Sequence, residues 1–534
     1  MKLNVSRPRR AIVLALALYA GLAGWIYFRA ADPLTEDAVT IRIAHWQNEL
    51  GPAEGLDAVI KRYEELNPGV HVKQMVIPPA VYRQWLRTNF VGENAADIVE
   101  YGTWLQGLSD IPVRYFAPLT SYLEEPNPYN LGTPLEAVPW LKTFTDELLE
   151  QRMNSPEPGQ YYAVTLTRAS FRLFGNRELL WTITGTEQAP RTLIELRNLA
   201  ARLAAYGETR RRPLSLFAGS RETASTLMSM YLMGSTSALV RELDHNGLLS
   251  LYPHHVLGTY LQGEWNFQHP GIRAGLELLA EFGAQMKPGY QQLSQDEAMR
   301  EFLRGDALFI FAGSWMATTL RRQASFPVVA FRAPQPTKDD PVVGRHVLGP
   351  FADGNAITSF GLYLNKRSPQ RAAAVDFMRF LTSFEGNALF SDTSDWPPSV
   401  RDVPMDPEVA AFISGADGYS LGAGWLGGGG NSRNLLLRNL HLLTGPKGSP
   451  ARLAVALDEQ MPLAVRSDLA SLARDAWLAI LPQDARIAAL GRLGSMQSDQ
   501  DMLISLERLE TAQNHSEARA LMLMHRMQST RAVP

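Results

Sequence analysis

The 534-residue sequence contains no cysteine. This absence excludes disulfide bonds, zinc–thiolate sites, thiol catalysis and a lipid-anchored N-terminal cysteine. The sequence also lacks a marked charge of either sign, since its formal net charge is −3, and it shows no basic stripe of the kind that nucleic-acid-binding proteins carry. A fixed-period repeat is absent as well. We therefore expect no nucleic-acid partner, no metal centre and no cofactor.

What is present is typical of a globular protein with more than one core. Apolar residues make up 46% of the sequence and charged residues 20%, which are ordinary values for soluble domains. A single hydrophobic core stops growing at roughly 250–300 residues, so a chain of 534 residues is expected to form at least two.

The N-terminus carries an apolar segment behind a basic one. Residues 1–10 contain four basic and no acidic residues, and residues 11–28 contain no charge. A stretch of this length just spans a bilayer, and the basic flank orients it so that the rest of the chain is exported. No position with the small residues that a signal peptidase reads follows the apolar segment. Residues 1–38 are therefore predicted to be an uncleaved signal anchor with a short linker; a cleaved signal peptide and a buried core helix are the alternatives.

Hydrophobic periodicity predicts alternating strands and helices after this segment. The spacing of apolar residues indicates strands at 39–46, 70–77 and 98–101 and helices at 56–66 and 80–90. This order is typical of a parallel sheet with helices on both faces. Capping boxes at Thr192–Glu195 and Ser294–Glu297 predict the start of two further helices.

One apolar strand is predicted in the middle of the chain. The segment FLRGDALFIFAGSW contains six uncharged residues, 307–312, and continues directly into Gly313, Ser314 and Trp315. A strand without polar residues needs cover on both faces. Because α/β sheets bind ligands at the carboxyl ends of their strands, Trp315 is expected at a ligand cleft.

This segment resembles the signature of family 1 extracellular solute-binding proteins, the sugar-binding subunits of ABC importers. The matching positions are Phe302, Gly305, Ala307, Gly313 and Trp315. Five other segments resemble the family in the same order: IRIAHW, YEELNPGVHVK, ADIVEYGTW, LLWTITGTEQAPRTLIELRNLAARLA and SFGLYLNKRSPQRAAAVDFMRFLTSFEGNALF. The resemblance covers roughly residues 39–450. The apolar N-terminus without a lipid cysteine and the tail after residue 450 depart from the family pattern.

The resemblance implies a maltose-binding-protein-like architecture, the two-lobed α/β fold of periplasmic binding proteins (type II). Parallel-rich sheets would carry helices on both faces, with the N-terminal membrane-spanning helix in front. The expected domains are lobe 1 at 39–165 and 305–336, lobe 2 at 168–304 and 342–449, and a helical C-terminal extension of short amphipathic helices at 450–534.

The resemblance also implies a function. The protein is expected to capture a carbohydrate, such as an oligosaccharide, without catalysis in the cleft between lobes that close over it. Delivery would be to the permease subunits of an ABC transporter, on the periplasmic or extracytoplasmic side of the cytoplasmic membrane, to which residues 11–28 would anchor the protein.

Candidate ligand-binding residues follow from the chemistry of sugars. Apolar faces of sugars pack on aromatic rings, and their hydroxyls need polar partners. Residues of these types that follow predicted strands or lie in loops rich in glycine and proline are Trp46, Glu100, Tyr101, Trp104, Arg168, Trp265, Trp315, Asn355, Trp396 and Trp425. For each of them, a structural or solvent-exposed role is the alternative interpretation.

Two other classes of function remain open: an exported enzyme acting on glycans, and a membrane-tethered sugar sensor whose helical tail binds a partner. The motif GYSLG at 418–422 fits a nucleophile elbow but lacks the required preceding strand and following helix. GAGWLG at 422–427 fits a dinucleotide fingerprint, also without a preceding strand. The pair His254–His255 has no further ligands at metal-binding spacing. No catalytic residue is therefore expected.

Overall fold

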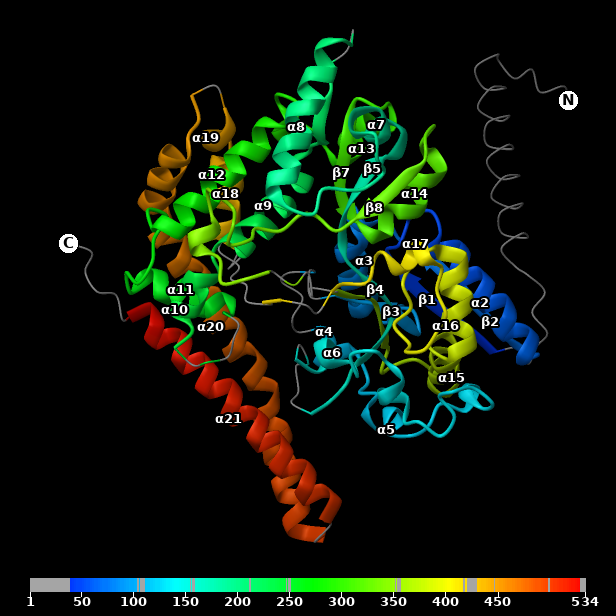
Figure 1. Ribbon diagram of the computed structural model, residues 1–534. Coiled ribbons are helices and arrows are strands. Elements are labelled where there is room, and N and C mark those ends of the chain that lie inside the picture. The colour runs from blue at the N-terminus through cyan, green and yellow to red at the C-terminus, as the bar shows by residue number, and fades with distance from the viewer. Residues whose placement is uncertain are drawn as a thin grey trace, which may run out of the picture.

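The computed structural model describes residues 39–102, 105, 111–153, 155, 159–210, 213–245, 247, 251–350, 352, 357–415, 418–419, 430–445, 447–497 and 500–528. These residues form two β-sheets, helices that cover them, and a long helical pair (Figure 1). The predicted anchor at 11–28 lies outside the described residues, as do Trp104, Asn355 and Trp425. In the described part of the chain, no helix combines the length and apolar character needed to cross a membrane.

The first sheet has the strand order β2-β1-β3-β9-β4. Its strands are β1 (Val39–His45), β2 (Val70–Val76), β3 (Ile98–Glu100), β4 (Ala163–Ala169) and β9 (Ile357–Leu364). β1 pairs in parallel with β2 and β3, whereas β9 runs antiparallel to β3 and β4. β4 is therefore parallel to β1 and β3, and the carboxyl ends of these three strands lie on one edge of the sheet.

Helices cover both faces of the first sheet, as the parallel strands require. One face packs on α2 (Pro52–Leu66), α15 (Arg371–Leu381) and α16 (Phe384–Ser394), and the other on α3 (Pro79–Val91). Short helices α4 (Ile111–Tyr115), α5 (Thr120–Leu123) and α6 (Leu149–Met153) complete this lobe. The strands and helices predicted between residues 39 and 101 are confirmed, with α2 beginning four residues before the predicted start.

The second sheet has the order β6-β7-β5-β8. Its strands are β5 (Phe171–Asn176), β6 (Ser215–Ala218), β7 (Ala307–Gly313) and β8 (Val328–Phe331). β6 and β7 are parallel, and β5 runs antiparallel to β7 and β8. All seven residues of β7 are buried, which confirms the central apolar strand predicted at 307–312.

The predicted assignment of strands to lobes is wrong for two segments. Residues 305–336 were expected in lobe 1, but β7 and β8 hydrogen-bond to β5 in the second sheet. Conversely, β9, α15 and α16 were expected in lobe 2, but β9 pairs with β3 and β4 in the first. An apolar strand fits either sheet, and its hydrogen-bonded neighbours decide where it belongs.

The helices of the second lobe surround its sheet. They are α7 (Arg177–Thr184), α8 (Leu193–Glu208), α9 (Arg221–Ser235), α10 (Ser237–Leu243), α11 (Pro253–Leu261), α12 (Pro270–Ala284), α13 (Gln295–Leu303), α14 (Ala317–Gln323), α17 (Pro407–Ala410), α18 (Gly430–Asn439) and α19 (His441–Thr444). Thr192 caps α8, and Ser294 with Glu297 forms both bonds of a capping box at α13. Both predicted helix starts are thus confirmed.

The chain crosses between the sheets through a connection of one residue, Ser170. Its carbonyl accepts a bond from the Ser314 amide at 2.8 Å, its amide donates to Ser314 Oγ at 3.2 Å, and its hydroxyl donates to the Phe412 carbonyl at 2.6 Å. Ser314 directly follows β7, and Ser170 directly follows β4. The carboxyl ends of the parallel strands in both sheets therefore meet at one junction.

The C-terminal extension is helical, but it is not a set of short helices. It consists of α20 (Pro450–Gln497) and α21 (Gln500–Gln528), which pack against each other and extend away from the second lobe (Figure 1). The first half of α20 belongs to the core of that lobe, because its apolar residues are buried together with those of α9 and α12: Leu453, Leu457, Met461, Val465 and Leu469.

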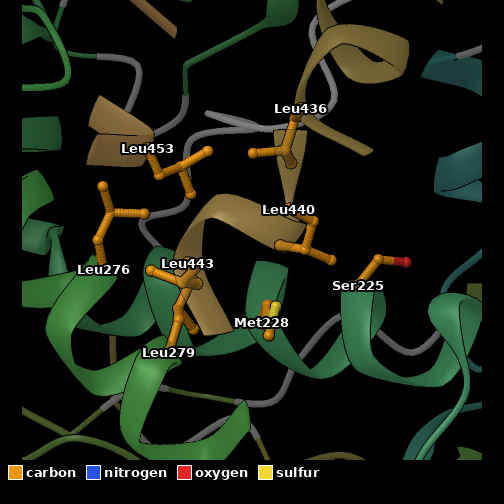
Figure 2. A pocket seen from close by; sticks show the side chains of 8 residues that line it. All are labelled: Ser225, Met228, Leu276, Leu279, Leu436, Leu440, Leu443 and Leu453. Carbon is orange, nitrogen blue, oxygen red and sulfur yellow. The ribbon is translucent and has the colours of Figure 1, made fainter. Parts of the chain in front are cut away.

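α20 also holds α18 in place. In Figure 2, Leu436 of α18 and Leu440, directly after it, face Met228 of α9 and the leucines of α12, and Leu453 lies beside them. The remaining cavity is about 10 Å³, room for one water at most. The buried carboxylate of Asp468 accepts bonds from the amides of Asn431 and Ser432, both at 2.9 Å. A residue of α20 thus satisfies amides in the first turn of α18, the task of an N-cap.

We predict that Asp468→Ala lowers the free energy of unfolding by about 1–2 kcal/mol, because the first amides of α18 lose a charged acceptor inside the protein. Asp475→Ala is the matched control, since Asp475 is exposed on the same helix and should change stability by less than about 0.5 kcal/mol. Urea unfolding of both variants measures the difference. Equal stability of the two variants would contradict the capping role.

Candidate ligand-binding site

The ends of β1 and β3 are tied together by a buried carboxyl group. Glu100, the last residue of β3, has no exposed surface. Its Oε2 accepts a bond from the Trp46 amide at 3.0 Å, and its Oε1 accepts one from the Gln47 side chain. Because Trp46 and Gln47 directly follow β1, Glu100 fixes the backbone at the point where the chain leaves the sheet.

Burial determines the ionisation of the acids at this edge. It raises the pKa of Glu100 well above its usual range, against the opposing effect of the bonds from Trp46 and Gln47. Burial also raises the pKa of Glu49, which lies close enough to add to the shift of Glu100. This edge of the first sheet therefore carries less negative charge than its two glutamates suggest.

Trp46 presents a fixed, half-buried indole beside these acids. Its ring meets Tyr82 of α3 edge-on, with centroids 5.1 Å apart, and Tyr82 in turn stacks on Trp85. The Tyr82 hydroxyl donates to the Glu100 carbonyl at 2.6 Å, which fixes the tyrosine. A partly exposed indole held in this way is suited to pack on an apolar ligand face.

Trp315 occupies the corresponding position at the second sheet. It follows β7, is half-buried, meets Phe171 edge-on at 5.3 Å and packs against the hydrophobic core of the first sheet. Its ring lies over Gly313, where an added Cβ would come within 2.3 Å of the indole. Gly313 has an ordinary φ of −71°, so the Gly-x-Trp pattern is required for space rather than for backbone freedom.

Two further predicted residues, Arg168 and Tyr101, are held by contacts within the protein. Arg168 of β4 is half-buried, and its Nε donates to the Pro398 carbonyl at 3.1 Å. Tyr101 packs edge-on against Phe116 and Tyr363. These contacts place Arg168 where the chain returns across the junction and Tyr101 in the first core.

Two predicted tryptophans lie in hydrophobic cores. Trp265 is 5% exposed in the second lobe, and its indole nitrogen donates to the Val256 carbonyl at 3.0 Å and to Thr259 Oγ1 at 3.2 Å. Trp396 is 2% exposed in the first core, and its indole nitrogen has no hydrogen-bond partner among the described residues. The satisfied, enclosed indole of Trp265 favours a packing role over ligand contact.

A groove in the second lobe was not predicted from the sequence. It has a volume of about 610 Å³ and lies between α9 and α18, lined by Arg221, Glu222, Ser225, Thr226, Asn431, Arg433, Asn434, Leu437 and Arg438. α9 follows β6, which runs parallel to β7, so the groove begins at the sheet edge that also carries Trp315. A search based on aromatic residues could not find it, because none lines it.

Comparison with protein families decides the assignment. Residues 58–412, about two thirds of the chain, match the family of bacterial extracellular solute-binding proteins. The chain belongs to this family. The resemblance predicted from the sequence is thereby confirmed.

Solved structures similar to this solute-binding protein have the same fold. RafE from Streptococcus pneumoniae has 16% identity and a TM-score of 0.54, covering 80% of this chain and 97% of that chain. RafE in complex with raffinose has 18% identity and a TM-score of 0.53, covering 79% and 98%. Maltose-bound MalE3 of T. maritima has 17% identity and a TM-score of 0.52, covering 80% and 100%. These structures confirm the predicted two-sheet α/β fold. A comparison with curated protein sequences gave no match.

The raised pKa of Glu100 predicts a pH effect on stability. The folded state holds the proton more tightly than the unfolded state, so ionisation of Glu100 destabilises the fold as pH rises above about 4.5. Glu100→Gln removes this titration while keeping the side-chain shape. The unfolding free energy of the parent minus that of the variant should fall between pH 4.5 and neutrality in urea titrations. A difference that rises with pH would show an ionised, stabilised carboxylate instead.

Trp315 and Gly313 should act together in ligand binding. Trp315→Ala is expected to weaken ligand affinity about thirtyfold, on the order of 2 kcal/mol, because a fixed apolar anchor is lost. Gly313→Ala should weaken binding in the same direction, because the new methyl group displaces the indole. Calorimetric titration measures both variants.

Trp265→Ala is the control for these two variants. It should cost roughly 3–5 kcal/mol of stability, because Trp265 is enclosed in the core, and leave the affinity of the folded protein unchanged. Affinity that survives Trp315→Ala together with a collapsed melting temperature would remove Trp315 from the site.

Proposed function

We propose that this solute-binding protein captures a carbohydrate in a cleft between its two lobes and releases it unchanged to the permease subunits of an ABC transporter. One observation carries the proposal: two half-buried indoles, Trp46 and Trp315, follow strands of different sheets whose carboxyl ends meet at one junction. A flat apolar ring on each lobe matches the apolar faces of a sugar ring.

Relatives with known ligands support this choice. The structures similar to the chain include RafE with raffinose, maltose-bound MalE3 and a chitin oligosaccharide binding protein. Ser170 supports closure of the lobes, because a single residue between β4 and β5 can serve as a short hinge. A ligand that contacts both walls would favour the closed arrangement.

We infer a non-catalytic role from the geometry of the acids. Glu100 is buried and engaged by Trp46 and Gln47, and its neighbour Glu49 lies on the same wall. Two acids that act on a glycosidic bond must flank it from opposite sides. An exported glycan-acting enzyme would need a second acid on the opposite wall.

We further propose that the protein works on the extracytoplasmic side of the membrane, held there by residues 11–28. The uncharged eighteen-residue segment behind a basic flank supports anchoring, and the family of extracellular solute-binding proteins supports export.

The full chain, extracted from membranes, tests the proposal. Its intact mass should correspond to residues 1–534 if the anchor is retained. Titration with raffinose, maltotriose, chitotriose and acidic oligosaccharides should give at least one ligand whose presence at 100 times its dissociation constant adds about 2.7 kcal/mol of stability. Chromatography of the ligand recovered after long incubation should show no product. Product in more than stoichiometric amount would assign the chain to the enzymes.

A further inference from the structure

The groove between α9 and α18 is rich in positive charge. Arg221, Arg433 and Arg438 line it, and Glu222 is the single carboxylate among its lining residues. Glu222 lies 3.4 Å from Arg221, and both side chains are exposed, so this pair is weak. The guanidinium groups of Arg433 and Arg438 make no hydrogen bond or ion pair with any residue that the structure describes.

The two helices that carry these arginines are fixed. Leu436 of α18 and Leu440, directly after that helix, point into the core that Figure 2 shows, whereas Arg433 and Arg438 are exposed and line the groove. Asp468 holds the first turn of α18. On α9, the buried Ser220 accepts a bond from the Thr223 amide at 3.1 Å. The groove arginines therefore lie on two helices that are held in place, as specific binding requires.

The groove begins at the edge of the second sheet that also carries Trp315. Arg221 begins α9 directly after the Gly219–Ser220 turn that ends β6, and Trp315 follows β7, the parallel neighbour of β6. The N-terminus of α9 also lies at this edge, and its helix dipole adds partial positive charge there. On the first sheet, both carboxyl oxygens of Glu100 already accept hydrogen bonds from Trp46 and Gln47.

We propose that the carbohydrate is an acidic one, a uronic-acid-containing oligosaccharide whose carboxylates bind Arg433, Arg438 and Arg221. The inference rests on the proposed function, sugar capture at the junction of the two lobes. A guanidinium offers paired donors that match the two oxygens of a carboxylate. A neutral sugar would desolvate three cations without any opposite charge in return, which is unfavourable.

The test compares matched trisaccharides on the full-length protein by calorimetry. Trigalacturonate, trimannuronate and a glucuronate-substituted xylotriose are the acidic probes, maltotriose and chitotriose are the neutral ones, and citrate is a polycarboxylate that is not a sugar. At least one acidic trisaccharide should bind about tenfold or more tightly than every neutral one. This preference should shrink in 0.5 M NaCl, because salt screens exposed charges.

Arginine variants identify the groups responsible. Arg433→Gln and Arg438→Gln should each weaken binding of the acidic trisaccharide about tenfold and leave neutral sugars unaffected. Arg300→Gln is the control, because Arg300 is an exposed arginine on α13 outside the groove. Both groove arginines are exposed, so the melting temperatures of all three variants should equal that of the parent.

The outcomes separate the two proposals. Tight binding of a neutral sugar that no arginine variant changes would overturn the acidic ligand and leave sugar capture intact. Binding of citrate without any saccharide would overturn both. Failure of all three acidic trisaccharides to bind would also overturn the acidic ligand.

Discussion

The backbone pairing of Ser170 with Ser314 holds the ends of β4 and β7 together where the chain passes from one sheet to the other. β4 ends at Ala169 and β5 begins at Phe171, so the connection has no slack. Both backbone groups of Ser170 bond to Ser314, and its hydroxyl bonds to Phe412 on the segment that returns from the first lobe. The end of β7 is thereby held against the end of β4. Trp315 owes its place between the two cores to this constraint, and the start of α9 follows from the parallel pairing of β6 with β7.

The two sides of the junction differ in chemistry. On the first sheet, an indole stands beside acids whose charge burial suppresses. On the second, an indole stands at the same edge as a groove with three arginines. The return crossing is secured by Arg172, a buried arginine whose guanidinium donates to the carbonyls of Ala411 and Ile413. Each lobe thus carries a half-buried indole at this edge, and the groove with three arginines lies on the second lobe.

Local patterns in the sequence predicted elements well and their long-range pairing poorly. The alternation at 39–46 and the apolar run at 307–312 located β1 and β7 to within one residue. The prediction of the sheet to which β7 belongs was wrong, because the sequence of a strand buried on both faces does not indicate which strands pair with it. Trp265 and Trp315 were both predicted as ligand-binding residues, but Trp265 is enclosed in the core of the second lobe and Trp315 is half-buried at the sheet edge. A proline usually ends or kinks a helix, yet α20 continues through Pro462, because Leu457, Met461 and Val465 on either side of it are buried in the second core. Nothing in the sequence near Arg433 and Arg438 indicates a binding groove, because the groove forms only when α9 packs beside α18.

Because α20 is part of the second core, the order of synthesis limits when the second lobe can fold. Leu173 and Leu469 belong to one core, so the second lobe cannot be sealed until about 300 further residues have been synthesised. The first lobe waits in a similar way for β9, which separates β3 from β4 in its sheet. The first lobe can therefore close only after β9 has been made and the second only after α20, so apolar strands stay uncovered until late. Chains with contacts this distant fold slowly and aggregate easily. The order of the strands therefore leaves the apolar strands of both sheets exposed for most of the time during which the chain is made.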